Sequence, residues 1–580
     1  MNMRMIKYII LLFFFFPLLS NAQGGKEDIS REVKLYNPFK PSLQKAGKIN
    51  FFPELGDTLI ESPEFRYDIS PRSFMPGYDI KTITAARLQP DPLPKLYKGF
   101  LKLGFGNYFS PYGELSIASD RSRKSVGGLY LNHESSYGKL KINDATSVYG
   151  GYMDNVARLY GTKFFRRTAL SANIDFNHIR RYAYGGDPVL LAPGETDKDS
   201  LKIEYFNPQA NIALYSTRLD SSKMQYDVDL NYNLLYQTSI YYQHLAALKA
   251  DFGYDMKIFY ASLGLDYEMI TIPNIEDKFR HRVNLNPAIS KNSANWNFKL
   301  GLKLTANARY YEDPGLPREY KTRLLFHPDV LFRFSIIPSI LNMDVGLDGE
   351  YADNNASEII YTNPFVITHN PAAPVKPDDD LYTILPTDTQ LRLKGGLTGH
   401  ATKNTSYRLR ASYSMFRDMV FYENDLFQGR GFDPLYDNGE LFELKAEVSA
   451  KINEEISISA RAGYYDYKME SLDEPWHKPS WDGRMIMKYN LRDKIIARAN
   501  VYALSERYAR FGPMPYSSSA DYSVNELPMN ISLNIGLEYR YTRILSFWAR
   551  LNNISLNRYY EWNFYPSQRF LLMAGFSYSL

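Results

Sequence analysis

The histidines are the first residues to consider for chemistry, because imidazole is a frequent metal ligand and general base. The chain contains eight histidines and no cysteine, which excludes thiolate metal sites and disulfides. The histidines are His133, His178, His244, His281, His327, His369, His400 and His477. No two of them have the spacing of a metal motif such as H-E-x-x-H. The sequence therefore predicts no metal centre and no cofactor.

The chain also lacks the short motifs of common nucleophile and phosphate chemistry. It contains neither a G-x-S-x-G turn nor a phosphate-binding G-x-x-x-x-G-K-[ST] loop. The acidic run Asp378-Asp379-Asp380 offers the oxygen ligands of a hard cation, but a solvated loop is the simpler interpretation. We predict that the chain is not an enzyme. The alternative that stays open is a lipid-modifying enzyme that assembles a serine and a histidine on neighbouring strands of a barrel wall.

A set of charged residues alternates with apolar residues and could select a solute. These candidates for a lumen-facing position are Asp227, Asp229, Lys299, Lys303, Glu443, Lys445 and Glu447. Charges that line a pore set its selectivity. The alternative interpretation is that they only pair with one another across the wall. Their spacing of two residues requires strands to position them.

Alternation with a period of two dominates the chain from about residue 96 to its end, and it predicts strands with one polar and one apolar face. Between Met224 and Tyr236, the even-numbered residues are apolar or aromatic and the odd-numbered residues are polar, with Leu235 as the only break. Similar segments cover residues 295–310, 442–452 and 527–540.

Several of these segments alternate for more than about a dozen residues, whereas soluble sandwich strands average about five or six. In a bilayer, every backbone amide needs a partner within the protein, so many long strands imply a closed barrel. We therefore expect an all-β fold: a large closed antiparallel transmembrane β-barrel of about 20–22 strands with a short N-terminal periplasmic arm.

The connections support this fold because short and long ones alternate. Short turns are predicted at 220–223, 291–294, 453–455, 491–494 and 541–543, and long loops near 185–200, 311–320, 353–388, 425–438, 471–479 and 511–525. Outer-membrane barrels have short periplasmic turns and longer extracellular loops.

The first residues have the features of a secretory signal peptide, with Arg4 and Lys7 before an apolar run of about 12 residues and a small-residue cleavage site ending at Ala22. We expect residues 1–22 to be the signal peptide, 23–96 a proline-rich periplasmic arm or a short plug-like segment, and 97–580 the barrel. The formal charge of +4 on 580 residues is too balanced to indicate a nucleic-acid partner.

The stretch that begins with Tyr97-Lys98-Gly99-Phe100-Leu101 and runs to the C-terminus resembles the barrel of TonB-dependent outer-membrane receptors. The last residues, 569–580, are similar to the final strand that the outer-membrane assembly machinery recognises, with Leu580 in the usual place of an aromatic residue. The segment before Tyr97 is shorter than the family's plugs and lacks their glycine-rich patterns. The resemblance is therefore to a receptor-like barrel without a standard plug.

The resemblance implies a location in the cell outer membrane of a Gram-negative envelope, in contact with lipid, and uptake or transport of a solute that the sequence does not identify. It also implies TonB or another periplasmic partner. The alternative hypothesis is a structural or assembly barrel that docks a periplasmic or surface partner.

Overall fold

The computed structural model describes residues 97–580 except for 121, 142–146, 187–197, 218–223, 238–240, 274–278, 312–318, 339, 367–383, 425–429, 513–521 and 556–557. The predicted signal peptide, the predicted N-terminal arm and Asp378-Asp379-Asp380 lie outside the described residues. Within the described part of the chain, no helix combines the length and the hydropathy that a membrane-spanning helix needs.

The described residues form a closed antiparallel barrel of 22 strands, which confirms the predicted fold class. The barrel strands are β1 (Gly99–Gly106), β2 (Ser110–Ala118), β3 (Ser125–Ser136), β6 (Tyr152–Phe164), β7 (Thr168–Tyr182), β8 (Lys202–Ser216), β9 (Gln225–Gln237), β10 (Tyr241–Asp255), β11 (Tyr260–Thr271), β12 (Arg280–Asn292), β13 (Trp296–Tyr311), β14 (Glu319–Ile337), β15 (Leu341–Ala352), β16 (Thr387–Thr402), β17 (Thr405–Asn424), β18 (Phe432–Lys451), β19 (Ile456–Met469), β20 (Trp481–Leu491), β21 (Ile495–Leu504), β24 (Asn530–Arg540), β25 (Leu545–Asn552) and β28 (Leu571–Ser579).

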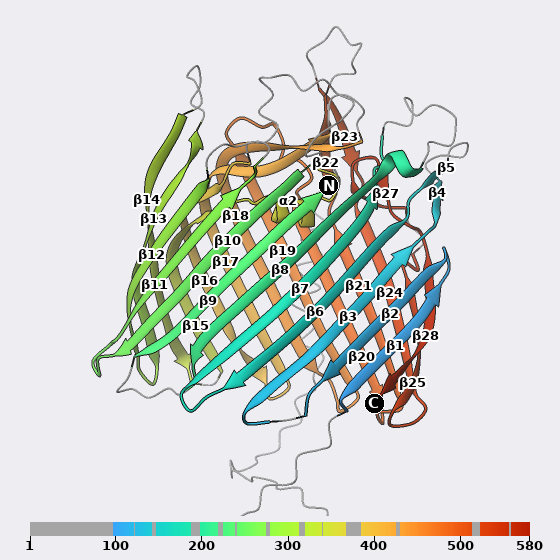
Figure 1. Cartoon of the computed structure of the whole chain (residues 1–580), viewed down its shortest axis with the longest axis horizontal. Coiled ribbons are helices and arrows are strands. Elements are labelled where there is room, and N and C mark those ends of the chain that lie inside the picture. Colours follow the sequence, from blue (N-terminus) through green and yellow to red (C-terminus); the bar gives the residue numbers. More distant parts are fainter. Residues whose placement is uncertain are drawn as a thin grey trace, which may run out of the picture. The chain divides into compact units, whose positions relative to one another are not determined.

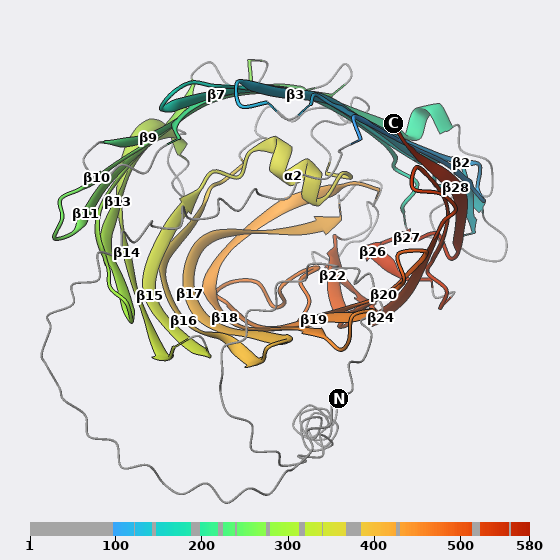
Figure 2. The ribbon, with the colours of Figure 1, turned by 90° about the horizontal axis from the view of Figure 1, so that it is seen from below.

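Smaller elements lie in the connections at one end of the barrel. They are β4 (Lys139–Lys141), β5 (Ser147–Tyr149), η2 (Lys198–Leu201), α2 (Ala356–Thr362), β22 (Arg507–Phe511), β23 (Ser523–Leu527), β26 (Tyr560–Trp562) and β27 (Tyr565–Pro566). Figure 1 shows α2, β22 and β23 at the upper end of the wall, and Figure 2 shows α2, β22, β26 and β27 within the ring of strands. This is the long-loop end, which is the extracellular end in an outer-membrane barrel.

The described turns at the opposite end are short, as predicted, at 293–295, 452–455, 492–494 and 541–544. The predicted turn at 220–223 falls outside the described residues. The predicted long loop 425–438 is wrong in its second half, because β18 already begins at Phe432 and pairs with Asn424 of β17. The two strands stay paired that far because Phe432 and Tyr422 pack in an interior cluster that the alternation pattern does not reveal.

The two faces of the strands differ as the alternation requires. On β9 and β13, the apolar residues Leu230, Tyr232, Leu300 and Leu302 are exposed, as expected for side chains that face lipid. The odd-numbered residues of β9 lie on the other face, and Leu235 of this face is buried against α2 inside the ring.

The barrel closes by pairing β1 with β28, from Phe100 opposite Ser579 to Gly106 opposite Met573. One row of residues crosses this seam: Trp548, Gly575, Gly104 and Tyr112 stand opposite one another on β25, β28, β1 and β2. The rings of Trp548 and Tyr112 meet edge to face over the two glycines, with centroids 5.7 Å apart. A Cβ atom at Gly104 would lie 2.4 Å from the indole. The seam therefore needs glycine where the indole crosses it.

We expect Gly104→Ala to destabilise the barrel by about 1–3 kcal/mol, because the added methyl group displaces the indole ring. The matched control is Gly113→Ala, whose methyl group would meet only Leu103 at an ordinary 3.7 Å. The measurement is the midpoint of heat-modifiable gel migration in detergent. In the background of Trp548→Ala, Gly104→Ala should cost much less. Equal midpoints for the two glycine variants would show that the ring does not restrict the seam.

Candidate functional site

The seven predicted lumen-facing residues lie on β9, β13 and β18, three strands that do not pair with one another. Asp229 accepts two hydrogen bonds from the amide of Asn211, at 2.7 and 2.8 Å, and Asp227 stands opposite Asp251. Lys303 donates to the carbonyl of Gly349 at 3.0 Å. The others form ion pairs: Lys299 with Asp329, Lys445 with Glu443, and Arg408 with Glu447. The structure does not bring the seven together, so a role in solute selection stays a prediction.

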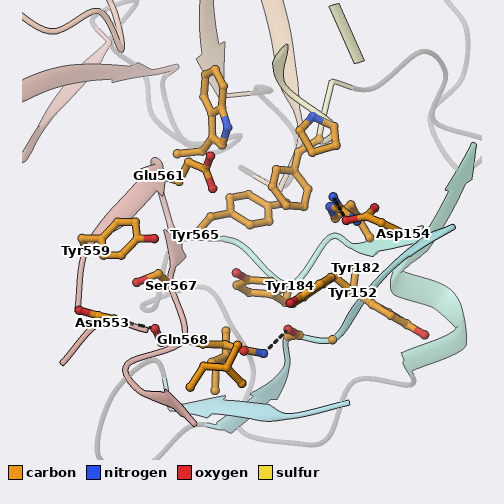
Figure 3. Close-up of a pocket in the computed structure, with 18 of the residues that line it drawn as sticks. Tyr152, Asp154, Tyr182, Tyr184, Asn553, Tyr559, Glu561, Tyr565, Ser567 and Gln568 are labelled. Atoms are coloured by element: carbon orange, nitrogen blue, oxygen red, sulfur yellow. Dashed lines mark hydrogen bonds and ion pairs between the residues drawn. The ribbon is translucent and has the colours of Figure 1, made fainter. Parts of the chain in front are cut away.

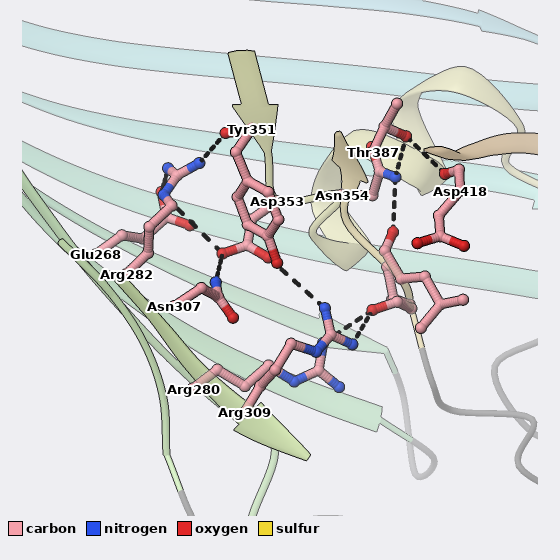
Figure 4. Close-up of polar contacts among 12 residues, drawn as sticks. Glu268, Arg280, Arg282, Asn307, Arg309, Tyr351, Asp353, Asn354, Thr387 and Asp418 are labelled. Atoms are coloured by element: carbon pink, nitrogen blue, oxygen red, sulfur yellow. Dashed lines mark hydrogen bonds and ion pairs between the residues drawn. The ribbon is translucent and has the colours of Figure 1, made fainter. Parts of the chain in front are cut away.

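A buried polar network connects β11, β12, β13 and β15 to the connection between β15 and β16 (Figure 4). The guanidinium of Arg282 contacts Glu268 at 2.8 Å and donates to the carbonyl of Tyr351 at 3.1 Å. Asp353, the first residue after β15, lies 3.8 Å from Arg309 and 4.0 Å from Arg282. Two cations thus hold the carboxylate at the start of this connection against the wall.

Hydrogen bonds also fix the end of the same connection to the wall. The carbonyl oxygen of Ile384 accepts hydrogen bonds from Arg280 at 3.3 Å and from Arg309 at 2.6 Å. The amide of Asn354 donates to the carbonyl of Leu385 at 2.7 Å and to the hydroxyl of Thr387 at 2.9 Å (Figure 4). The connection therefore turns back into the barrel at both of its described ends.

Helix α2 begins this inward connection. Asn355 is its N-cap, and its side chain accepts a hydrogen bond from the backbone N–H of Glu358 at 3.0 Å. Ala356, Ile359 and Ile360 have the spacing of one helix face, and all three are buried. The side chain of Gln243 on β10 accepts a further hydrogen bond from the N–H of Ala356 at 3.1 Å.

Leu235, which breaks the alternation of β9, is explained by this helix. It is 1% exposed and forms one cluster with Tyr205, Leu245, Ile270 and Ile272 of the wall and with Ala356 and Ile360 of α2. The inner face gains an apolar patch where α2 packs on it, and the polar side chains that the helix covers are hydrogen-bonded to it, Gln243 to Ala356 and Asn207 to Ser357. The break at Leu235 marks this position in the sequence but does not identify the helix that covers it.

A second cluster joins connections that are far apart in the sequence. Phe365 stacks on Tyr565 with centroids 3.8 Å apart, and Trp562 contacts both Tyr422 and Phe432 edge on. All five side chains are less than a tenth exposed. We call α2 with residues 363–366, β22–β23 and β26–β27 the cap. It gives the barrel a hydrophobic core at its long-loop end.

Polar contacts fix the parts of the cap to one another. The amide of Asn563 donates to Asn424 at the end of β17 at 2.7 Å and accepts from Asn525 of β23 at 3.0 Å. Arg507 of β22 donates to the carbonyl of Glu561 in β26 at 2.9 Å. Buried amides and guanidinium groups of this kind are costly unless their geometry is satisfied, so they specify one arrangement of the loops.

His477, in the connection between β19 and β20, supports the cap from one side. Its Nδ1 lies 3.1 Å from the carbonyl oxygen of Tyr422, and its ring lies against Phe432 and Trp562. Burial, together with the positive charge of Arg507, lowers the pKa of His477 to about 3. The residue is therefore neutral at physiological pH and donates from Nδ1.

A cavity of about 570 Å³ lies between the cap and the wall formed by β6, β7, β24, β25 and β28 (Figure 3). Its lining includes the tyrosines Tyr152, Tyr182, Tyr184, Tyr361, Tyr559 and Tyr565. Its charged side chains are Glu561 and the pair Asp154–Arg181, whose shorter contact is 2.7 Å. A concave aromatic site with a few polar groups is the usual form of a small-molecule site. The sequence did not predict it, because no common period relates strand residues of its lining, such as Tyr152 and Tyr182, to residues of the connections, such as Tyr184 and Tyr559.

We expect Leu235→Asn to release α2 while the barrel stays closed, because the exchange buries an amide and removes about 3 kcal/mol of apolar packing. Limited proteolysis at the long-loop end should become faster without loss of heat-modifiable migration. Leu331→Asn is the control, since Leu331 shares the face of Lys299 far from α2. If the two variants are digested equally, α2 is not held by Leu235.

We also expect the cap to loosen at acid pH. An unfolded histidine has a pKa near 6.5, so the folded state with neutral His477 has its full stability above that pH and loses it as the pH falls toward 3. Protease sensitivity between pH 7 and pH 4 measures the effect. His477→Asn should flatten the pH profile, because the amide mimics the Nδ1 donor and asparagine accepts the φ of 62° at this position. A variant as acid-sensitive as the wild type would contradict the assignment.

No protein-family model and no curated protein matches the sequence. Solved structures do match. The pyoverdine outer-membrane receptor FpvA from Pseudomonas aeruginosa has a TM-score of 0.62 at 10% identity, over 84% of this chain and 79% of that one. The ferric-catecholate import receptor Fiu from E. coli has 0.59 at 10%, over 84% and 82%, and the iron transporter FrpB from Neisseria meningitidis has 0.62 at 8%, over 84% and 82%. At such identities the likeness concerns the fold: this chain forms an outer-membrane β-barrel with the barrel fold of the TonB-dependent receptors.

Proposed function

We propose that the protein takes up a solute across the outer membrane, and that the cap controls access to the lumen from outside. The observation that carries this proposal is the cavity between the cap and the wall. A purely structural barrel has no need of a concave aromatic site under its own loops. The solved structures that this chain resembles are named as receptors and transporters, which also supports a role in uptake.

The path of the solute follows from the arrangement. The solute enters at the long-loop end, binds against the tyrosines and passes along the polar inner faces of the strands to the periplasmic end. The cap must move for passage, because Phe365, Trp562 and Tyr565 line the cavity and are also packed in the core of the cap. An energy-coupling partner in the periplasm, TonB or another protein, would supply the work. In this proposal the protein is a transporter and not an enzyme.

The charged inner faces are consistent with this path. Asp227, Asp229, Lys299, Lys303, Glu443, Lys445 and Glu447 contribute both signs of charge, and most have a neutralising partner beside them. A wall of paired charges binds water without holding an ion tightly. Solutes of different charge can then pass, and specificity resides in the cavity.

A cysteine pair that fastens the cap to the wall tests the proposal. The chain has no cysteine of its own, so Asn424→Cys with Asn563→Cys introduces a single disulfide between β17 and the β26–β27 hairpin. In planar bilayers containing KCl, the oxidised protein should open less often than the wild type, because the cap cannot leave the lumen. Reduction should restore the openings.

The control is Ser449→Cys with Ser459→Cys, which cross-links β18 to β19 at a position where the two hydroxyl oxygens are 3.1 Å apart. This pair lies near the short-turn end and does not contact the cap. Its oxidation should leave the openings unchanged. If both disulfides have the same effect, or if neither has any, the cap does not gate the barrel and a docking role becomes the better interpretation.

A further inference from the structure

The charges of the cavity indicate what kind of solute it takes. Asp154 and Arg181 contact each other through two hydrogen bonds, at 2.7 and 3.1 Å, so each satisfies the other. The remaining charge on the lining is Glu561, and the guanidinium of Arg507 lies close by, bound to the carbonyl of the same residue at 2.9 Å. Within the described lining, no cluster of like charges is present that would recognise a strong anion or cation.

The described part of the cavity also offers no ligand set for a metal ion. The described residues contain no group of three or more histidine and carboxylate side chains able to hold a metal ion. A ferric or cupric complex could still be recognised through its organic part, but such complexes commonly carry charge. On the described lining, the only counter-charge beyond the Asp154–Arg181 pair is the carboxylate of Glu561, and the guanidinium of Arg507 lies beside the same residue.

The cavity does offer aromatic rings to a solute. Six tyrosines, Trp562 and Phe365 line it, but Phe365, Trp562, Tyr182 and Tyr565 are less than a tenth exposed. The rings accessible to a solute are therefore those of Tyr152, Tyr184, Tyr361 and Tyr559. Tyr361 of α2 is the most accessible of these rings, because it is 50% exposed and is not part of the apolar cluster that holds α2 against the wall. The face of an aromatic ring is electron-rich and attracts weakly positive C–H groups. The pyranose ring of a sugar presents such C–H groups on its flat faces.

Uncharged hydrogen-bonding groups also lie on the lining of the cavity. The amides of Asn534, Asn552 and Gln568 lie on the lining together with the hydroxyl of Ser532. The side chain of Gln568 already donates to Ser136 at 2.9 Å, and that of Asn534 accepts from the backbone N–H of Asn553 at 2.8 Å. The side-chain carbonyl oxygen of Gln568 and the amino group of Asn534 remain for the hydroxyl groups of a solute. Rings for the C–H faces and amides for the hydroxyl edges are the two requirements of a polyhydroxylated ligand.

We propose that the solute is a neutral, polyhydroxylated molecule of the class of short saccharides. The inference rests on the proposed function for the idea that a solute enters the cavity, and it adds the chemical class. The volume of about 570 Å³ falls within the range of small-molecule sites, roughly 300–1,000 Å³. The aromatic side chains contribute most of the binding energy, and the amides select the arrangement of hydroxyl groups.

Calorimetric binding to the purified full-length protein tests the class. The probes are neutral di- to tetrasaccharides built from hexose, pentose, deoxyhexose or N-acetylhexosamine units, each with an anionic uronic-acid counterpart and a cationic amino-sugar counterpart. At least one neutral saccharide should bind. The dissociation constants of its charged counterparts should be higher by about tenfold or more. If no neutral saccharide binds, or if a charged counterpart binds more tightly, the proposal is wrong.

Variants of Tyr361 locate the binding. Tyr361→Ala removes the exposed ring and should weaken binding of the neutral saccharide about tenfold, whereas Tyr361→Phe keeps the ring and should change it little. Glu561→Gln should also change it little, because no charge is recognised. Equal affinity of wild type and Tyr361→Ala would place the saccharide elsewhere and overturn the assignment.

The two proposals can fail separately. If a neutral saccharide binds as described but the cap disulfide leaves the bilayer openings unchanged, the class of ligand stands and transport through the cap fails. If the cap disulfide stops the openings but the cavity prefers a charged probe, transport stands and the class of solute is wrong.

Discussion

The wide lumen of the barrel is the constraint on which the rest of the structure depends. A wall of 22 strands must be apolar toward lipid and polar toward water, so its inner face provides no hydrophobic core. The cap supplies that core at one end. The cap packs on the inner face where that face carries the apolar residues Leu235 and Leu245. Arg280 and Arg309 fix the end of the β15–β16 connection by donating to the carbonyl oxygen of Ile384.

The wall could be predicted from the sequence because its physical rule is local. Alternation with period two assigned Leu302 and Lys303 to opposite faces and gave a strand count of about 20–22, and the barrel has 22 strands. The cap could not be predicted, since its contacts join residues such as Tyr184, Phe365, Phe432 and Tyr565 that follow no common period. Leu235 was visible as an exception in the pattern, but the pattern alone does not say what packs against an exception.

For the candidate site, too, alternation predicts residues of the wall but not the contacts made by the connections. The alternation predicts seven charged residues that the structure distributes over three separate strands, whereas the tyrosines that line the cavity come from strands, helix α2 and connections that no single sequence pattern relates. The proposed site thus combines residues of the rigid wall with residues of the connections that the wall positions. The connection between β15 and β16 illustrates this, since Asp353 and Ile384 fasten its two described ends to β12 and β13.

The most direct measurement of the central claim is backbone amide hydrogen exchange of the full-length protein in lipid bilayers. If the loops at the long-loop end form a core inside the barrel, the amides of α2 and of the β26–β27 hairpin will exchange nearly as slowly as those of the neighbouring wall strands β9 and β10. Exchange as fast as that of an unstructured peptide, with the wall still protected, would show that these loops extend into solvent and that the lumen has no cap.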